Sequence, residues 1–226
     1  MNSFEMPEGI YHIPLRLPWS TPSNVNVYLI EENDGYIMID CGVDGSEYLD
    51  LLKSHLVEIG IGFSDIKLLI GTHMHIDHIG LSGSLREFDI PFALYENSVD
   101  YLDEYNNWSI RFADLVIMAK KESAPKTFID DLKSITTPVY AGKLTKPDIL
   151  LSEGKIKSVK RNLNVIFTPG HDYSEISVHD EHSKIIFSGD HILPKITPFI
   201  PVQNEESNLL KEFINCLLYT SDAADD

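Results

Sequence analysis

A run of four metal-ligand side chains constrains this chain more than any other feature: His73, His75, Asp77 and His78. The run follows the apolar stretch Ile66 to Ile70, which is typical of a buried strand. Side chains two positions apart on an extended segment project the same way, so His73 and His75 point to one side. Asp77 and His78 then begin a helix and approach from another side. Because imidazoles and carboxylates are good ligands for zinc, the run predicts a metal site at a strand end.

Two later turns have the same form and offer further ligands. His171 closes a Thr-Pro-Gly turn after the apolar run 165–167, and Asp190 closes a Ser-Gly turn after the run 185–187. Either signal alone is weak, because a histidine after Pro-Gly is often a turn residue and an aspartate after glycine often caps a helix. In this order, they favour three loops that converge on one rim of a sheet. The alternative for the first cluster is a histidine-rich surface turn.

The motif at residues 73–78 resembles the His-x-His-x-Asp-His signature of the metallo-β-lactamase superfamily, and His171 and Asp190 resemble its third histidine and bridging aspartate. The resemblance covers roughly residues 9–198. It implies an α/β fold, an αββα four-layer sandwich of two mixed β-sheets with helices outside. It also implies two Zn²⁺ ions, with iron or manganese as alternatives. One metal would take His73, His75 and His171, the other Asp77 and His78, and Asp190 would bridge them.

The same resemblance implies a metal-dependent hydrolase that uses a metal-bound hydroxide on an ester or thioester-type bond of a small molecule. Asp77 would be the catalytic residue that aims this hydroxide. The hydroxyacylglutathione hydrolase-like subgroup is the most similar, but Glu175 stands where that subgroup often has a histidine, and a late histidine ligand has no candidate after His191. Two alternatives stay open: a mononuclear iron enzyme that oxidises a persulfide, and an inactive truncated fragment or binding module.

Other polar residues have less certain roles. Asp40 ends the strand-like run 36–40, where it either orients a metal-bound histidine or hydrogen-bonds its own turn. His191 follows the bridging aspartate and either reaches substrate or an outer ligand position, or points away. Lone histidines elsewhere are expected to be ordinary non-ligand residues: His12, His55, His179 and His182.

The remaining chain reads as two groups of strands around a helical segment. We predict early strands over 9–13, 26–31 and 36–40, a helix over 46–59, a helix from about 78 to 88 and a strand over 91–95. We predict late strands over 148–151, 156–159, 165–168, 176–179 and 185–188. Residues 96–147 form a mostly helical insertion over the metal rim, or two surface helices whose aromatic side chains face the core.

Composition excludes some classes of partner. The chain has 226 residues and a formal net charge of −17, which argues against nucleic acid and anionic membranes. Two cysteines and no signal-peptide pattern favour the cytoplasm. No apolar run approaches the roughly 20 residues of a membrane span. The oligomeric state is not predicted.

The last eleven residues, 216–226, do not continue the family pattern. They resemble the translation of a sequencing-library adapter. We therefore predict a metallo-β-lactamase-like domain over 1–215, a probable non-native tail over 216–226, and a fold that is incomplete at its C-terminus.

Overall fold

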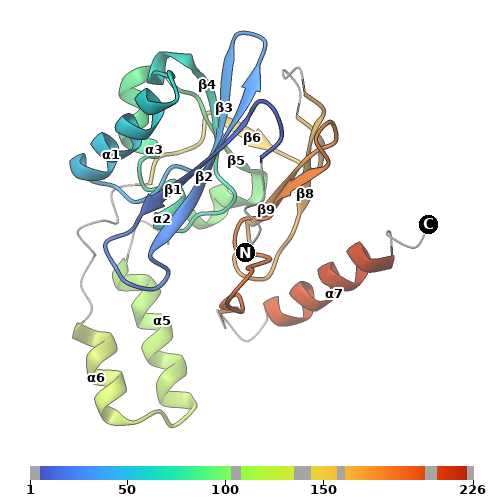
Figure 1. Cartoon of the computed structure of the whole chain (residues 1–226). Helices are drawn as coiled ribbons and strands as arrows, with labels where there is room; N and C mark the ends of the chain where they lie inside the picture. Colours follow the sequence, from blue (N-terminus) through green and yellow to red (C-terminus); the bar gives the residue numbers. More distant parts are fainter. Residues whose placement is uncertain (1–5, 103–107, 135–143, 157–160, 202–207, 223–226) are drawn as a thin grey trace.

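The computed structural model describes residues 6–102, 108–134, 144–156, 161–201 and 208–222. Two β-sheets lie face to face, and helices cover the outer face of the first sheet (Figure 1). Alternate residues of the central strands feed two separate cores. Met38 and Leu69 pack with the helices, whereas Ile37, Ile39 and Leu68 pack against the second sheet. The predicted α/β architecture of two sheets with outer helices is confirmed.

The first sheet is mixed, as expected. Its strands are β1 (Ile10–Arg16), β2 (Asn24–Glu32), β3 (Gly35–Ile39), β4 (Ile66–Ile70), β5 (Phe92–Tyr95) and β6 (Ile149–Leu151), in that spatial order. The first three strands pair antiparallel, and β3 to β6 pair parallel. Parallel strands end at the same edge, so the loop after β4 opens at the rim that receives the other loops of the site.

The second sheet differs from the expectation of a mixed sheet. Its strands are β7 (Gly154–Lys155), β8 (Leu163–Phe167), β9 (Ile176–Asp180) and β10 (Ile185–Phe187). The described strands all pair antiparallel, because short turns connect β8 to β9 and β9 to β10 without a crossover helix. β8 and β10 therefore run in the same direction, and their ends bring His171 and Asp190 to one rim.

The described helices are α1 (Ser46–Glu58), α2 (Ile76–Ile79), α3 (Ser82–Leu85), α5 (Trp108–Lys121), α6 (Lys126–Ser134) and α7 (Leu209–Asp222), with the 3-10 turns η1 (Phe63–Asp65), η2 (Arg86–Phe88) and η3 (Glu96–Tyr101). α1 places Leu52 and Leu56 in the core, as its apolar spacing predicts. None of the helices in the described ranges is long and apolar enough to span a bilayer.

Three element predictions were wrong in detail. The single helix over 78–88 is two short helices and a 3-10 turn. Gly80 lies so close to the loop after β3 that an added Cβ would be 2.6 Å from the Asp44 amide nitrogen. β1 continues through Pro14, which an edge strand tolerates because one side of its backbone needs no partner. β7 begins at Gly154, two residues earlier than predicted, and residues 157–160 lie outside the described ranges.

The predicted insertion is mostly helical where it is described, and residues 144–147 form neither helix nor strand. α5 and α6 lie side by side and extend away from the two sheets (Figure 1). Phe128 of α6 is half exposed, so at least this aromatic side chain does not face a core. Residues 103–107 and 135–143 lie outside the described ranges. Contact of this helix pair with a substrate stays a prediction.

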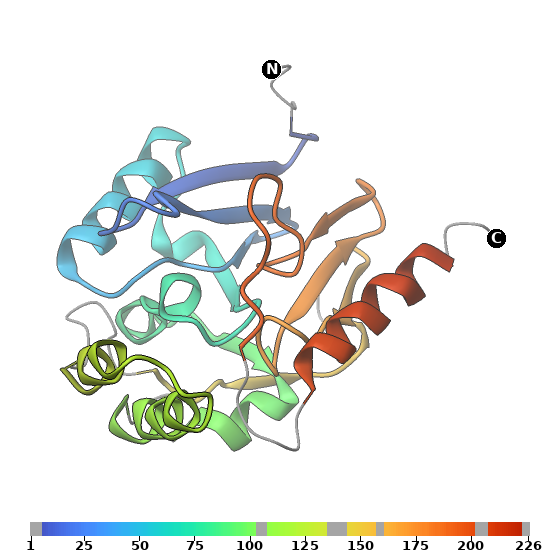
Figure 2. The same cartoon turned by 90° about the horizontal axis from the view of Figure 1, so that it is seen from below.

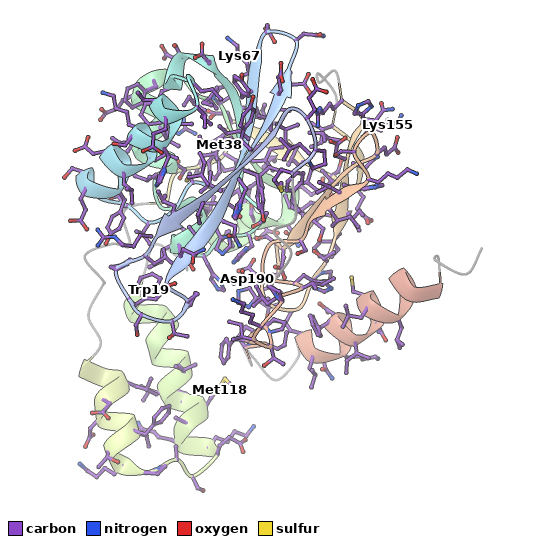
Figure 3. All side chains as sticks on the ribbon, viewed as in Figure 1. Trp19, Met38, Lys67, Met118, Lys155 and Asp190 are labelled. Atoms are coloured by element: carbon purple, nitrogen blue, oxygen red, sulfur yellow. The ribbon has the colours of Figure 1, made fainter. Side chains whose placement is uncertain are left out.

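The two ends of the sandwich differ in what they carry. Asp190 and Trp19 lie at one end, and Lys67 and Lys155 lie toward the other (Figure 3). Seen from below, α7 runs beside the second sheet (Figure 2). The predicted boundary of the native protein at residue 215 falls within α7. The origin of residues 216–226 stays a prediction.

Candidate metal centre

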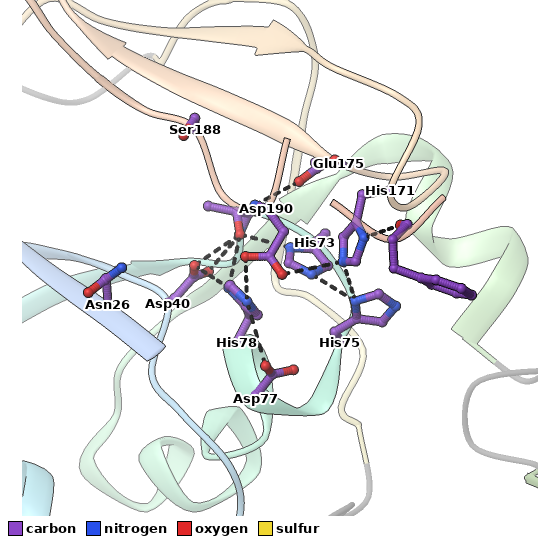
Figure 4. Close-up of polar contacts among 12 residues, drawn as sticks. Asn26, Asp40, His73, His75, Asp77, His78, His171, Glu175, Ser188 and Asp190 are labelled. Carbon is purple, nitrogen blue, oxygen red and sulfur yellow. Dashed lines mark hydrogen bonds and ion pairs between the residues drawn. The ribbon is translucent and has the colours of Figure 1, made fainter. Parts of the chain in front are cut away.

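The structure brings all six predicted site residues to one rim, from three loops far apart in sequence (Figure 4): His73, His75, Asp77, His78, His171 and Asp190. The first four follow β4, and the others follow β8 and β10. A backbone hydrogen bond joins the loops, because the Ile176 amide donates to the Thr72 carbonyl at 2.9 Å. The start of β9 is thereby fixed to the end of β4, so the two sheets meet at the site.

His73, His75 and His171 form one group, in which ring nitrogens face one another. His75 Nδ1 lies 3.0 Å from His73 Nε2 and 2.8 Å from His171 Nε2. All three nitrogens belong to a set of ligand atoms within 4.8 Å of one another. Their protonation follows from what each ring touches on its other side.

The outer partners leave two of these nitrogens without a hydrogen. His171 Nδ1 lies 2.6 Å from the Phe199 carbonyl, which only accepts, so Nδ1 carries the hydrogen. His73 Nδ1 lies 3.0 Å from the Thr72 hydroxyl, which donates to Asp40 and so accepts from His73. In neutral rings, both Nε2 atoms are then bare lone pairs. His75 Nδ1 has at most one hydrogen to give, so one lone pair always faces another nitrogen.

His78 and Asp190 form the second group. His78 Nε2 lies 3.4 Å from Asp190 Oδ1 and 3.9 Å from Asp77 Oδ2. The other oxygen of Asp190 lies 3.5 Å from His171 Nε2. Asp190 therefore stands between the two groups, with one oxygen toward each. This is the placement that the sequence predicts for a bridging carboxylate.

Asp40 fixes the positions of His78 and Thr72 by accepting hydrogen bonds from both residues. It is buried, and its Oδ2 accepts a hydrogen bond from His78 Nδ1 at 2.7 Å. Its Oδ1 accepts the Thr72 amide at 2.8 Å, and the Thr72 hydroxyl also donates to it. Of the two roles that the sequence left open for Asp40, the structure has the first: it fixes the ring of His78 so that Nε2 faces Asp77 and Asp190. The backbone of Asp40 is left-handed, with φ 58°, which aspartate tolerates better than most residues.

The electrostatics of the site are shaped by burial and by opposite charges. Burial lowers the pKa of His73 well below its usual value, and the neighbouring imidazoles lower it further. Burial also opposes charge on His78, but Asp40 and Asp190 outweigh it and raise the pKa of His78 well above its usual value. Burial would raise the pKa of Asp190, yet His78, His171 and His75 lower it to about 2. The rim thus combines an ionised Asp190 with a neutral His73 and with a His78 whose charged form is favoured.

These residues fit a cation. Three nitrogens with at most one hydrogen between them repel one another, and a positive ion placed among them would remove that repulsion. The carboxylates of Asp77 and Asp190 both face His78 Nε2, and a cation there would offset their negative charges. The donor set of imidazole and carboxylate suits zinc and similar divalent metals.

Three further groups hold the site residues in place, and the sequence did not predict these roles. The Thr72 hydroxyl touches Asp40 and His73, the Phe199 carbonyl fixes the ring of His171, and Glu175 accepts the Asp190 amide hydrogen at 2.9 Å. A backbone carbonyl leaves no sequence signal. Glu175 did leave a signal. It directly precedes the apolar start of β9, where a buried side chain is expected, and it is buried in the structure.

The lone histidines do not join the site. His12 lies on β1 and hydrogen-bonds Asn26, and His55 lies on α1 beside Glu58. His179 and His182 lie at the Asp180 end of β9, away from the rim. His191 is buried next to the site, with its ring 4.7 Å from that of Phe213 on α7.

The sequence profile of the metallo-β-lactamase superfamily matches residues 20–223. The chain belongs to this superfamily. In a member of this family, the His/Asp cluster described above implies the use of a divalent metal. The match begins in the loop before β2 and therefore includes every strand end that carries a site residue.

Similar proteins carry hydrolase names. Human acyl-coenzyme A thioesterase MBLAC2 is 25% identical over 196 residues, which are 81% of this chain and 63% of that protein. A probable metallo-hydrolase of Methanocaldococcus jannaschii is 32% identical over 170 residues, 74% of this chain and 66% of that protein. The chain thus spans less than two thirds of the length of these relatives.

The fold is shared with solved structures. A metallo-β-lactamase family protein of Thermus thermophilus superposes with a TM-score of 0.75 at 24% identity, covering 92% of this chain and 68% of that one. At such identity the likeness shows the fold alone. It accounts for the two sheets and the outer helices, and it leaves the substrate open.

Proposed function

We propose that the protein is a metal-dependent hydrolase that acts on small-molecule thioesters or related esters. His73, His75 and His171 would hold one zinc ion, and Asp77 and His78 the second, with Asp190 between them. The observation that carries the proposal is the set of facing nitrogens of His73, His75 and His171, which neutral rings cannot satisfy by hydrogen bonding. Bound divalent metal lowers the pKa of water and polarises a substrate carbonyl.

The chain's own residues supply orientation and proton handling. Asp40 accepts a hydrogen bond from His78 Nδ1, which leaves Nε2 as the nitrogen that would bind the metal. The Phe199 carbonyl does the same for His171. Asp77 is partly exposed at the rim, with its side chain 19% accessible, and its carboxylate accepts a hydrogen bond from the attacking water and aims it.

The choice of a thioester as substrate rests on the names of the similar proteins and not on the geometry of the metal site. MBLAC2 proteins of human, cattle and chicken are named acyl-coenzyme A thioesterases. The site motif also resembles that of the hydroxyacylglutathione hydrolase-like subgroup, but Glu175 occupies a position where that subgroup often has histidine. An acyl thioester with a carrier other than glutathione is therefore the first substrate class to test.

The test is hydrolysis of a substrate panel, followed as thiol release from acyl-coenzyme A thioesters and acylglutathiones and as acid release from lactones. We expect thioester hydrolysis that a chelator abolishes and zinc restores, and an Asp77→Asn variant that keeps the metal of the three-histidine group but loses most of kcat. Glu58→Gln, an exposed change on α1, is the matched control and should behave as wild type. Failure of the zinc-loaded protein to hydrolyse any member of the panel would contradict the proposal.

Metal analysis separates this proposal from the iron alternative. A single iron per chain, with oxygen consumption on a persulfide substrate, would replace hydrolysis by oxidation. We further propose that the protein works in the cytoplasm, where the buried thiol of Cys41 stays reduced. Fractionation of cells tests this location.

A further inference from the structure

Glu175 lies behind the proposed metal centre and touches the loop that carries Asp190. Its residue is completely buried, at 0% exposed. Its Oε1 accepts the hydrogen of the Asp190 amide at 2.9 Å (Figure 4). A buried acid with this contact is a costly choice of residue, since a neutral side chain would fill the same space with less loss of hydration. The contact with Asp190 is what a neutral apolar side chain would not provide.

The turn before Asp190 packs closely against Thr72 on one side and Glu175 on the other. Gly189 has φ +54°, and an added Cβ there would lie 3.0 Å from Thr72 and 3.2 Å from Glu175 Oε1. Thr72 belongs to the loop that carries the first histidines, and Glu175 immediately precedes β9. The backbone at residues 189–190 is therefore fixed between the two sheets. Its position decides where the Asp190 carboxylate can reach.

We propose that Glu175 is a positioning residue that holds the carboxylate of Asp190 between His78 and His171 by accepting the Asp190 amide hydrogen. This inference rests on the proposed function, because it assigns Glu175 to the same metal site. Without the acceptor, the amide is left unpaired and the turn relaxes. The oxygens of Asp190 would then leave the positions 3.4 Å from His78 Nε2 and 3.5 Å from His171 Nε2.

The second oxygen of Glu175 gives a way to separate positioning from mere stability. Glu175 Oε2 has no hydrogen-bond partner among the described residues, and His191 Nδ1 lies 3.8 Å away. An unpaired buried oxygen costs stability, so an apolar residue of similar length should not destabilise the fold. A purely structural role predicts the opposite. Metal affinity and stability should therefore move in different directions when Glu175 is replaced.

The experiment compares Glu175→Met with Glu175→Gln in the full chain. Glutamine keeps an oxygen for the Asp190 amide, and methionine does not. We expect Glu175→Met to bind Zn²⁺ about 10- to 100-fold more weakly in chelator competition, with unchanged or raised stability of the metal-free protein. Glu175→Gln should restore the wild-type affinity. The visible spectrum of the Co²⁺-loaded protein should change in the methionine variant alone.

Asp180→Asn is the matched control. Asp180 is a buried acid at the other end of β9, so its replacement should lower stability and leave Zn²⁺ affinity unchanged. Wild-type affinity and spectrum in Glu175→Met would overturn the positioning role, as would a glutamine variant as weak as the methionine one. A wild-type protein that binds neither Zn²⁺ nor Co²⁺ would overturn the proposed function and this inference together. Metal binding by wild type without any effect of Glu175→Met overturns the inference alone.

Discussion

The second sheet has a carboxylate near each end, Asp180 buried and Asp190 partly exposed, and their surroundings differ. At one end, Asp180 accepts hydrogen bonds from Arg161 at 2.8 Å and from the His182 amide at 3.0 Å, and the Ser183 hydroxyl adds a third. At the other end, Asp190 faces imidazole nitrogens at 3.4 and 3.5 Å. The first cluster is complete within the protein. The second is arranged for a partner that the chain does not supply.

This difference separates stability from function within one sheet. Arg161 also donates to the Glu8 carbonyl at 2.9 Å and its amide donates to Glu32, so it ties the second sheet to the edge of the first. The end around Asp190 has lone pairs that repel one another. One end therefore holds the sandwich together, and the other uses that rigidity to hold ligand atoms in place.

Removal of the shared histidine nitrogen should give the largest effect on this comparison. His75→Ala takes away the atom that both His73 and His171 face. We expect loss of metal uptake at this group and a fall in hydrolysis on the order of a thousandfold, because several kcal/mol of transition-state stabilisation depend on the metal. Elemental analysis and initial rates check both. Full metal stoichiometry in this variant would count against the ligand assignment, and His55→Ala on α1 serves as the control.

Replacement of Arg161, at the opposite end of the second sheet, should lower stability and leave metal binding unchanged. Arg161→Met leaves the completely buried Asp180 without its cation, so we expect the free energy of unfolding to fall by about 3 kcal/mol. Metal affinity should not change. Urea denaturation of the metal-free protein gives the first value and chelator competition the second. A variant that unfolds as wild type does, or that loses metal instead, would break the division between the two ends.

A change at Asp40 should have an intermediate effect on the metal site. Asp40→Asn keeps the size of the side chain and its tolerance of the left-handed backbone, but its amide no longer reliably accepts from His78 Nδ1. We expect metal affinity to fall about 10- to 100-fold, because the ring of His78 loses its orientation. Competition with a chelator measures this change. Wild-type affinity would mean that His78 is fixed by packing alone.

The pH dependence of stability should give the smallest effect. Burial would raise the pKa of Asp180, but hydrogen bonds from Ser183 and Arg161 outweigh it and the pKa is lowered. A lowered folded-state pKa stabilises the protein above the unfolded value of about 3.9, and this stability is lost as the pH falls through the folded value. Unfolding in chelator should therefore show a steeper acid loss for wild type than for Asp180→Asn. Parallel curves would contradict the linkage.

The sequence predicts the site best where several residues of metal-ligand type lie close together in the chain. His73, His75 and His78 follow a clear apolar strand, and strand ends also marked His171 and Asp190, so the structure gathers them as predicted. The role of Asp40 was left between two options, because a carboxylate at a strand end has no sequence signal for its partner 38 residues away. Glu175 was noted only as a departure from the family pattern.

The fold was predicted best where periodicity is strong. The spacing of Leu52 and Leu56 gave α1 almost to its ends. The helix expected over 78–88 failed because Gly80 packs against the backbone of another loop, which is a tertiary contact that no local pattern contains. The second sheet was expected to be mixed, but its short turns allow only antiparallel neighbours. The local sequence therefore predicts the helices and strands better than it predicts which strands pair and in which direction.

The central claim is that His73 Nε2, His75 Nδ1 and His171 Nε2 surround one divalent cation. Anomalous diffraction at the zinc absorption edge, from crystals of the zinc-loaded chain, tests it most directly. We predict a strong peak in contact with all three nitrogens and with an oxygen of Asp190 at its edge. An empty map at these nitrogens, with zinc bound elsewhere or nowhere, would contradict it.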